Sequence, residues 1–180
     1  GMFSTSWDGG RYSKTIRDEV EEWVDRVNTT LKAEFKAHKT DAAWLMQNGY
    51  LSGFIKDTLE SYAGRNGTTL EEILSGKHKL TGFYSSYMPK YRKEKAYEAI
   101  SQELTAIRNS ENGDHKVHAL SDIVGGVTKN RATCGWGHST SYWSVQDPAV
   151  EAFAEMQEAY VTGEESLATL RKYLPKSMAC

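Results

Sequence analysis

The chain has 180 residues, of which 39% are hydrophobic and 26% are charged, and its formal net charge is -2. This length and composition are typical of a globular protein with one domain or two small ones, whereas the near-neutral charge does not favour nucleic-acid binding, which needs a concentrated basic surface. No run of about 18 apolar residues is present, so we expect no membrane span, and the N-terminal sequence does not resemble a signal peptide.

The first half of the chain is predicted to be helical. Residues 1–14 are rich in glycine and serine and read as an irregular arm. Apolar residues then recur at helical spacing over residues 16–35, which predicts an amphipathic helix. Asp41 can cap a second helix, with a break expected near Gly49. Residues 68–76 hold a capping-box pattern and predict a further short helix.

The middle of the chain alternates between expected loops and helices. Residues 77–89 read as a loop with aromatic anchors, and residues 90–108 have the spacing of a long helix. A turn is expected at residues 109–114. A short helix should follow over residues 116–124 and stop at the glycine pair at positions 125–126.

The last third changes character before it becomes helical again. Threonine, tryptophan and tyrosine are frequent around two glycines, which predicts one small β-hairpin at about residues 131–145. Asp147 and Pro148 then favour a helix start. The expected fold is mainly α, with five to seven helices and this hairpin. Residues 15–110 would form a helical N-terminal part, and residues 111–180 would pack with it as one unit.

A metal site is one candidate for chemistry in the C-terminal part. His115 and His118 are three residues apart, so on a helix they would point from one face, and Glu151 or Glu155 could complete a zinc site from the next helix. The segment around Glu151 and Glu155 is similar to the third-ligand helix of zincin metallopeptidases, which implies a zinc-dependent hydrolase, active or degenerate. However, the His-Glu-x-x-His pattern that would supply a general base is absent. The alternative is an ordinary solvated carboxylate face on an amphipathic helix.

Two further candidates involve other chemistry. Cys134 and His138 are close in sequence and could form a thiolate–imidazole pair, but a free cysteine is more often a small buried hydrophobe. Basic residues at positions 90–95 lie among tyrosines and could contact a nucleic acid. The alternative is that the tyrosines pack inward on a solvated helix, and nucleic acid is not an expected partner.

Four sequence elements, taken in order, carry a resemblance to a known family. They are Leu120-Ser-Asp122, Trp136-Gly-His138 followed by Tyr142-Trp143, Glu151-Ala-Phe-Ala154, and the terminal Tyr173-Leu-Pro-Lys-Ser177. Together they resemble the C-terminal region of the minor head, or head-morphogenesis, proteins of tailed phages and prophages. The resemblance covers residues 119–177, about a third of the chain. The portal-associated region of such proteins is not recognisable in residues 1–110.

The resemblance implies a structural role in virion assembly. The expected partners are other phage head or portal proteins, or further copies of the chain, in the cytoplasm of a bacterial host or in the virion. No catalysis and no cofactor are then expected.

The residues themselves suggest how such a module would be built. We expect Trp136, Tyr142 and Trp143 to anchor the hairpin against Phe153 and Tyr160 of the next helix. Asp122 can accept hydrogen bonds from backbone amides or from His138, which would then orient the hairpin.

Overall fold

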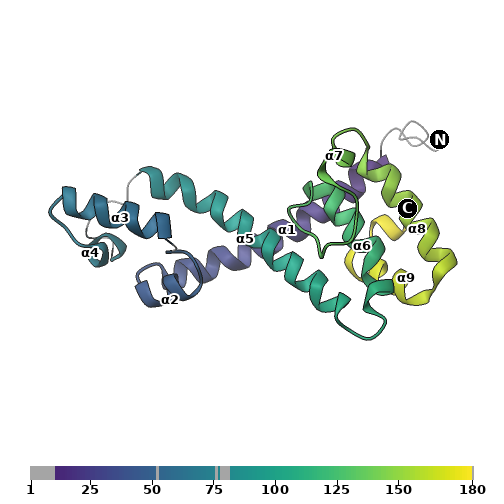
Figure 1. Cartoon of the computed structure of the whole chain (residues 1–180), viewed down its shortest axis with the longest axis horizontal. Helices are drawn as coiled ribbons and strands as arrows, with labels where there is room; N and C mark the ends of the chain where they lie inside the picture. The colour runs from purple at the N-terminus through teal and green to yellow at the C-terminus, as the bar shows by residue number, and fades with distance from the viewer. Residues whose placement is uncertain (1–10, 52, 76, 78–81, 180) are drawn as a thin grey trace. The chain divides into compact units, whose positions relative to one another are not determined.

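The computed structural model describes residues 11–51, 53–75, 77 and 82–179 (Figure 1). These residues contain nine α-helices and a short 3-10 helix, and no β-strand is found among them. The helices are α1 (Arg11–His38), α2 (Ala42–Gln47), α3 (Gly53–Arg65), α4 (Leu70–Leu74), α5 (Gly82–Arg108), α6 (Gly113–Thr128), α7 (Thr140–Trp143), α8 (Pro148–Thr162) and α9 (Glu164–Tyr173), followed by the 3-10 helix η1 (Ser177–Ala179). Among the described helices, none combines the length and apolar character that crossing a membrane requires.

The mainly helical fold class is confirmed, but the helix count of five to seven is too low. The additional elements are short: the second predicted helix is divided near Gly49 into α2, of six residues, and α3, and α7, of four residues, lies where the hairpin was predicted. Segments of one or two turns are too short to show a helical period in the sequence. Of the expected irregular arm, residues 1–10 lie outside the described part of the chain, and helix α1 already begins at Arg11.

Two compact units divide the chain, and their boundaries differ from the expected one near residue 111. One unit holds the residues up to Val27 together with those from Glu94 onward, and the other holds Asn28–Lys93. Both long helices, α1 and α5, contribute residues to each unit. A division of the chain at a single point is therefore not what the structure shows.

The unit of residues 28–93 has its own apolar core. The buried members come from α2 to α5 and the turns between them: Leu45, Tyr50, Leu51, Ile55, Leu59, Leu74 and Met88. Thr69 and Glu72 form the expected capping box at the start of α4, and the break near Gly49 separates α2 from α3. Residues 82–89 are helical, which corrects the expected loop; Met88 is buried in this core, and Pro89 lies inside α5.

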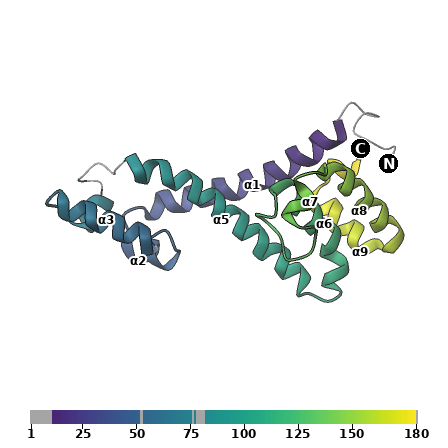
Figure 2. The same cartoon turned by 45° about the horizontal axis from the view of Figure 1, so that its top comes forward.

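Helix α6 is the centre of the other unit. It packs against α8 and α9, which also pack against each other, and the three lie side by side in both views (Figures 1 and 2). Every residue from Ala119 to Gly126 is buried. A helix that is buried on all sides needs partners for its polar groups as well as for its apolar ones.

The glycine pair in α6 permits close packing and does not end the helix, contrary to expectation. The helix continues to Thr128 and is closed by Lys129, whose backbone is left-handed with φ 55°. A Cβ on Gly126 would lie 3.0 Å from the Trp143 ring and 3.1 Å from Pro148. Small residues at this point therefore allow α7 and the start of α8 to approach α6.

The C-terminal end of the chain is attached to α1 by a buried carboxylate. Glu19 is 4% exposed, and its Oε1 accepts a hydrogen bond of 2.8 Å from the backbone N–H of Lys176. Its Oε2 accepts bonds from the backbone N–H and the hydroxyl of Ser177, at 2.9 and 2.7 Å. These three donors satisfy the buried charge and orient the segment that begins η1.

We predict that Glu19→Ala lowers the free energy of unfolding by about 2–4 kcal/mol, because two backbone N–H groups and a hydroxyl lose their acceptor in a buried place. Urea unfolding followed by circular dichroism measures the change. Glu22→Ala is the control, since Glu22 meets the Lys176 side chain at an exposed position. An equal loss in both variants would contradict the role assigned to Glu19.

Candidate functional site

Polar side chains of α6 hold the segment that follows it, residues 129–139. The hydroxyl of Ser121 donates to the carbonyl oxygen of Trp136 at 3.0 Å and accepts from the N–H of Cys134 at 3.3 Å. The hydroxyl of Thr128 accepts from the N–H of Ala132 at 3.1 Å. The backbone groups of this segment are thus paired with side chains of a helix.

Side chains outside the core of α6 complete this attachment. Ser101 on α5 accepts from the N–H of Thr133, and Arg108 donates to the carbonyl oxygen of Cys134, at 3.0 and 2.9 Å. Asn130 donates from its side-chain amide to the carbonyl oxygen of His138 at 2.8 Å. The predicted β-hairpin at residues 131–145 is therefore wrong: several backbone groups of residues 132–138 bond to side chains, and residues 140–143 form helix α7.

Two glycines, on either side of Trp136, allow this segment to turn toward α6. Gly135 and Gly137 have φ values of 88° and 122°, in the region that other residues rarely adopt. A Cβ on Gly137 would lie 2.5 Å from Oδ1 of Asp122. Glycine at this position lets the backbone reach the carboxylate.

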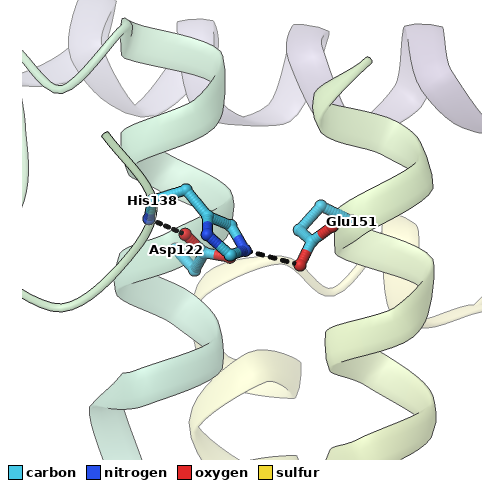
Figure 3. Close-up of side chains that lie close together, drawn as sticks. All are labelled: Asp122, His138 and Glu151. Carbon is cyan, nitrogen blue, oxygen red and sulfur yellow. Dashed lines mark hydrogen bonds and ion pairs between the residues drawn. The ribbon is translucent and has the colours of Figure 1, made fainter. Parts of the chain in front are cut away.

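Asp122, His138 and Glu151 meet at this point (Figure 3). Asp122 comes from α6, His138 from the segment before α7, and Glu151 from α8. The backbone N–H of His138 donates to Asp122 Oδ1 at 2.9 Å, as the sequence suggested. The imidazole Nε2 of the same residue lies 2.9 Å from Glu151 Oε1 and 3.9 Å from Asp122 Oδ2.

Aromatic residues of α7 cover one side of this group. Tyr142 stacks on the His138 imidazole, with ring centroids 3.9 Å apart, and its hydroxyl donates to Glu151 Oε2 at 2.7 Å. Trp143 is buried, and its ring meets the edge of both rings. The His138 side chain remains 42% exposed, so small solutes can reach it from solvent.

A second imidazole–carboxylate pair lies beside the first group. Nδ1 of His118 is 3.4 Å from Oε2 of Glu155, and the Glu155 carboxylate is buried. The ring of Trp136 meets the edge of His118 at 5.2 Å, and its N–H donates to Asp114 at 3.0 Å.

The environment of the group shifts several pKa values. Burial raises the pKa of the Asp122 carboxyl, and the hydrogen bond from the backbone of His138 opposes this change. Burial also raises the pKa of Glu155, while His118 lowers it. The hydrogen bond to Glu151 raises the pKa of His138, and the bond to the same carboxylate raises the pKa of Tyr142 to about 12.

The predicted zinc ligands are only partly brought together. Among the described residues, the single group of three or more side chains that could hold a metal is Asp122, His138 and Glu151, whose ligand atoms lie within 4.8 Å of one another. Glu151 is the only predicted ligand in it. His118 and Glu155 form the neighbouring pair, whereas His115 is exposed on α6.

The other candidate residues have structural surroundings. Cys134 is buried, as expected for a small hydrophobe, and the imidazole of His138 is bonded to Glu151. Phe153 on α8 is 39% exposed and meets the Tyr12 ring edge-on. In the basic segment, Tyr97 is buried beneath the Arg131 guanidinium.

No family model, no curated protein and no solved structure matches the chain.

We predict that Gly137→Ala destabilises the protein by about 2–4 kcal/mol, because the new methyl group collides with Asp122 in addition to straining the backbone. Gly135→Ala is the matched control: it carries comparable backbone strain, but its Cβ meets only Arg108 at 3.6 Å. Thermal and urea unfolding of both variants measure the difference. Equal destabilisation would show that the approach to Asp122 contributes nothing.

Proposed function

We propose that the protein is a phage-derived minor head, or head-morphogenesis, component that acts through protein–protein contacts in capsid assembly. The proposal starts from the resemblance of residues 119–177 to the C-terminal region of such proteins. The proposed partner is the portal protein of the same phage.

One observation supports the proposal most directly: residues from separate elements of the resemblance bond to one another. Asp122 of the Leu-Ser-Asp element accepts from His138 of the Trp-Gly-His element. His138 and Tyr142 both bond to Glu151 of the Glu-Ala-Phe-Ala element. A shared order of motifs thus corresponds to one physical unit, as expected if the motifs encode a folded module.

The fourth element is attached to the same compact unit. Lys176 and Ser177 belong to the terminal Pro-Lys-Ser element, and both bond through their backbone N–H groups to Glu19 on α1. The residues of the resemblance therefore contribute mainly to holding the module in shape. A structural role in an assembly requires such a rigid module together with an exposed contact surface.

Helix α8 offers an apolar contact surface. Val150, Phe153, Tyr160 and Val161 are exposed by 45%, 39%, 56% and 87% and share one side of the helix. Exposed apolar residues that gather on one face are a common feature of protein-binding sites. We assign this α8 surface to the portal contact.

We predict that Val161→Asp combined with Val150→Asp weakens binding to the portal protein at least tenfold, because unpaired carboxylates would be buried in the contact. Isothermal titration calorimetry with the portal protein encoded by the same phage measures the affinity.

Met46→Asp is the control for this experiment, since Met46 is an apolar residue with 51% exposure in the other unit. Unchanged affinity in the α8 double variant would contradict the assignment of the surface. Absence of binding by the unmodified protein would contradict the portal as its partner.

A zincin-like metal hydrolase, active or degenerate, is the second candidate. It is favoured by the position of Glu155 beside Asp122, His138 and Glu151. The Glu155 carboxylate is buried, and its Oε2 lies 3.4 Å from Nδ1 of His118. A buried carboxylate next to a metal could act as the general base toward a bound water molecule.

If the protein is an active hydrolase, we predict that it cleaves fluorescein-labelled casein in the presence of zinc. The rate of cleavage should fall at least 100-fold in Glu155→Gln. Removal of a general base typically costs two to four orders of magnitude in rate. The release of labelled peptides measures the activity, with EDTA-treated protein as the control. Cleavage that persists in EDTA or in Glu155→Gln would contradict this role.

A further inference from the structure

We propose that Asp122, His138 and Glu151 form a binding site for one divalent transition-metal cation, with Zn²⁺ as the expected occupant. This inference goes beyond the head-assembly role, which needs no metal. The three residues come from α6, from the segment before α7 and from α8, and their side chains point toward one another (Figure 3).

The spacing of the three ligand atoms fits one cation. Ligands at about 2.1 Å from zinc in a tetrahedral arrangement are about 3.4 Å apart. His138 Nε2 lies 2.9 Å from Glu151 Oε1 and 3.9 Å from Asp122 Oδ2. Displacements of about 1 Å would therefore bring these pairs to the spacing that the metal requires, and the ligand atoms of all three residues lie within 4.8 Å of one another.

Each carboxylate already has one oxygen held by the protein. Asp122 Oδ1 accepts from the backbone of His138, and Glu151 Oε2 accepts from the hydroxyl of Tyr142. The second oxygen of each carboxylate faces Nε2 of His138. Hydrogen bonds from outside the ligand set are how proteins orient metal-binding carboxylates, so the atoms left over are the ones that would bind.

Two buried carboxylates provide an independent reason for a cation. Asp122 is 2% exposed, and its Oδ2 faces Nε2 of His138 at 3.9 Å, beyond hydrogen-bond distance. Glu155 is 7% exposed, and its Oε2 lies 3.4 Å from Nδ1 of His118. Buried carboxylate oxygens normally have donors or metal partners. A cation at the three-residue site would neutralise Asp122 directly and Glu155 at short range.

The donor set indicates the class of metal. One imidazole nitrogen and two carboxylate oxygens suit Zn²⁺, Mn²⁺ or Fe²⁺, whereas Mg²⁺ prefers oxygen ligands alone and soft metals prefer thiolates. Because Nε2 of His138 is hydrogen-bonded to Glu151, the proton of that bond would have to leave when a metal binds Nε2, either to Nδ1 of the same ring or to solvent. No change of oxidation state is involved.

The test uses the full chain after dialysis against EDTA, titrated with ZnCl₂ in a calorimeter. We expect one zinc per chain, with a Kd at least 100-fold weaker in His138→Ala and in Glu151→Gln. Tyr142→Phe should weaken binding about 10- to 100-fold, as observed for partners that orient metal ligands. Mg²⁺ should not compete at equal concentration.

His115→Ala is the matched control, because His115 is an exposed histidine on the same helix as Asp122. Its affinity should equal that of the unmodified chain. An equal loss in His115→Ala and His138→Ala would overturn the assignment and favour the ligand set expected from sequence spacing alone. Absence of saturable binding tighter than about 0.1 mM would overturn the site altogether.

A spectroscopic measurement covers the case in which a ligand variant fails to fold. Co²⁺ bound to the unmodified chain should give visible d–d absorption bands that Zn²⁺ abolishes by displacement. Circular dichroism of metal-free Glu151→Gln reports whether it remains folded; a folded variant that still gives the Co²⁺ bands would contradict the role of Glu151. Loss of metal binding would also remove the hydrolase candidate but would leave the head-assembly proposal untouched, so the two failures are distinguishable.

Discussion

The hydrogen bond from the backbone of His138 to Asp122 joins a buried helix to the irregular segment that follows it. The middle of helix α6, from Ala119 to Gly126, is buried, and burial of a polar group without a partner costs free energy. Ser121, Asp122 and Thr128 find partners in three backbone N–H groups of the following segment, those of Cys134, His138 and Ala132. The same bonds place the His138 imidazole beside Glu151 of α8. The geometry of the candidate site therefore depends on the buried polar side chains of α6.

The long helices could be predicted from the sequence, whereas the segment after α6 could not. Apolar residues at helical spacing define α1, the later part of α5, and α8, because each of these helices buries one face. Residues 129–139 have the composition of a strand, but composition does not say where the backbone groups bond. That information lies in Ser101, Ser121 and Asn130, whose side-chain roles have no sequence period. The glycine pair at 125–126 was misread for a related reason, since close packing of Trp143 and chain termination both favour glycine.

The candidate metal ligands meet partners other than those that their spacing in the sequence predicted. Histidines three residues apart on a helix suggest two ligands of one metal ion. However, His115 is exposed, and His118 lies beside Glu155. The group that forms joins residues 16 and 13 positions apart, through a segment without regular structure. Spacing rules apply within one helix, so they cannot predict a contact between residues of separate elements. The one signal available was chemical: Asp122 is an acceptor in an apolar stretch, which suggested a bond with His138.

Helix α8 separates the two proposed roles physically. Its buried side carries Ala152, Glu155, Met156 and Ala159, while Val150, Phe153, Tyr160 and Val161 are exposed. Glu151 lies at the border, half-buried, where its carboxylate reaches both His138 and Tyr142. Because residues at i, i+3, i+4 and i+7 share a face, a substitution on the outer side leaves the ligand side in place. A contact surface and a cation site can therefore coexist on one helix. The cation would also strengthen the attachment of α8, which presents the contact surface, to α6.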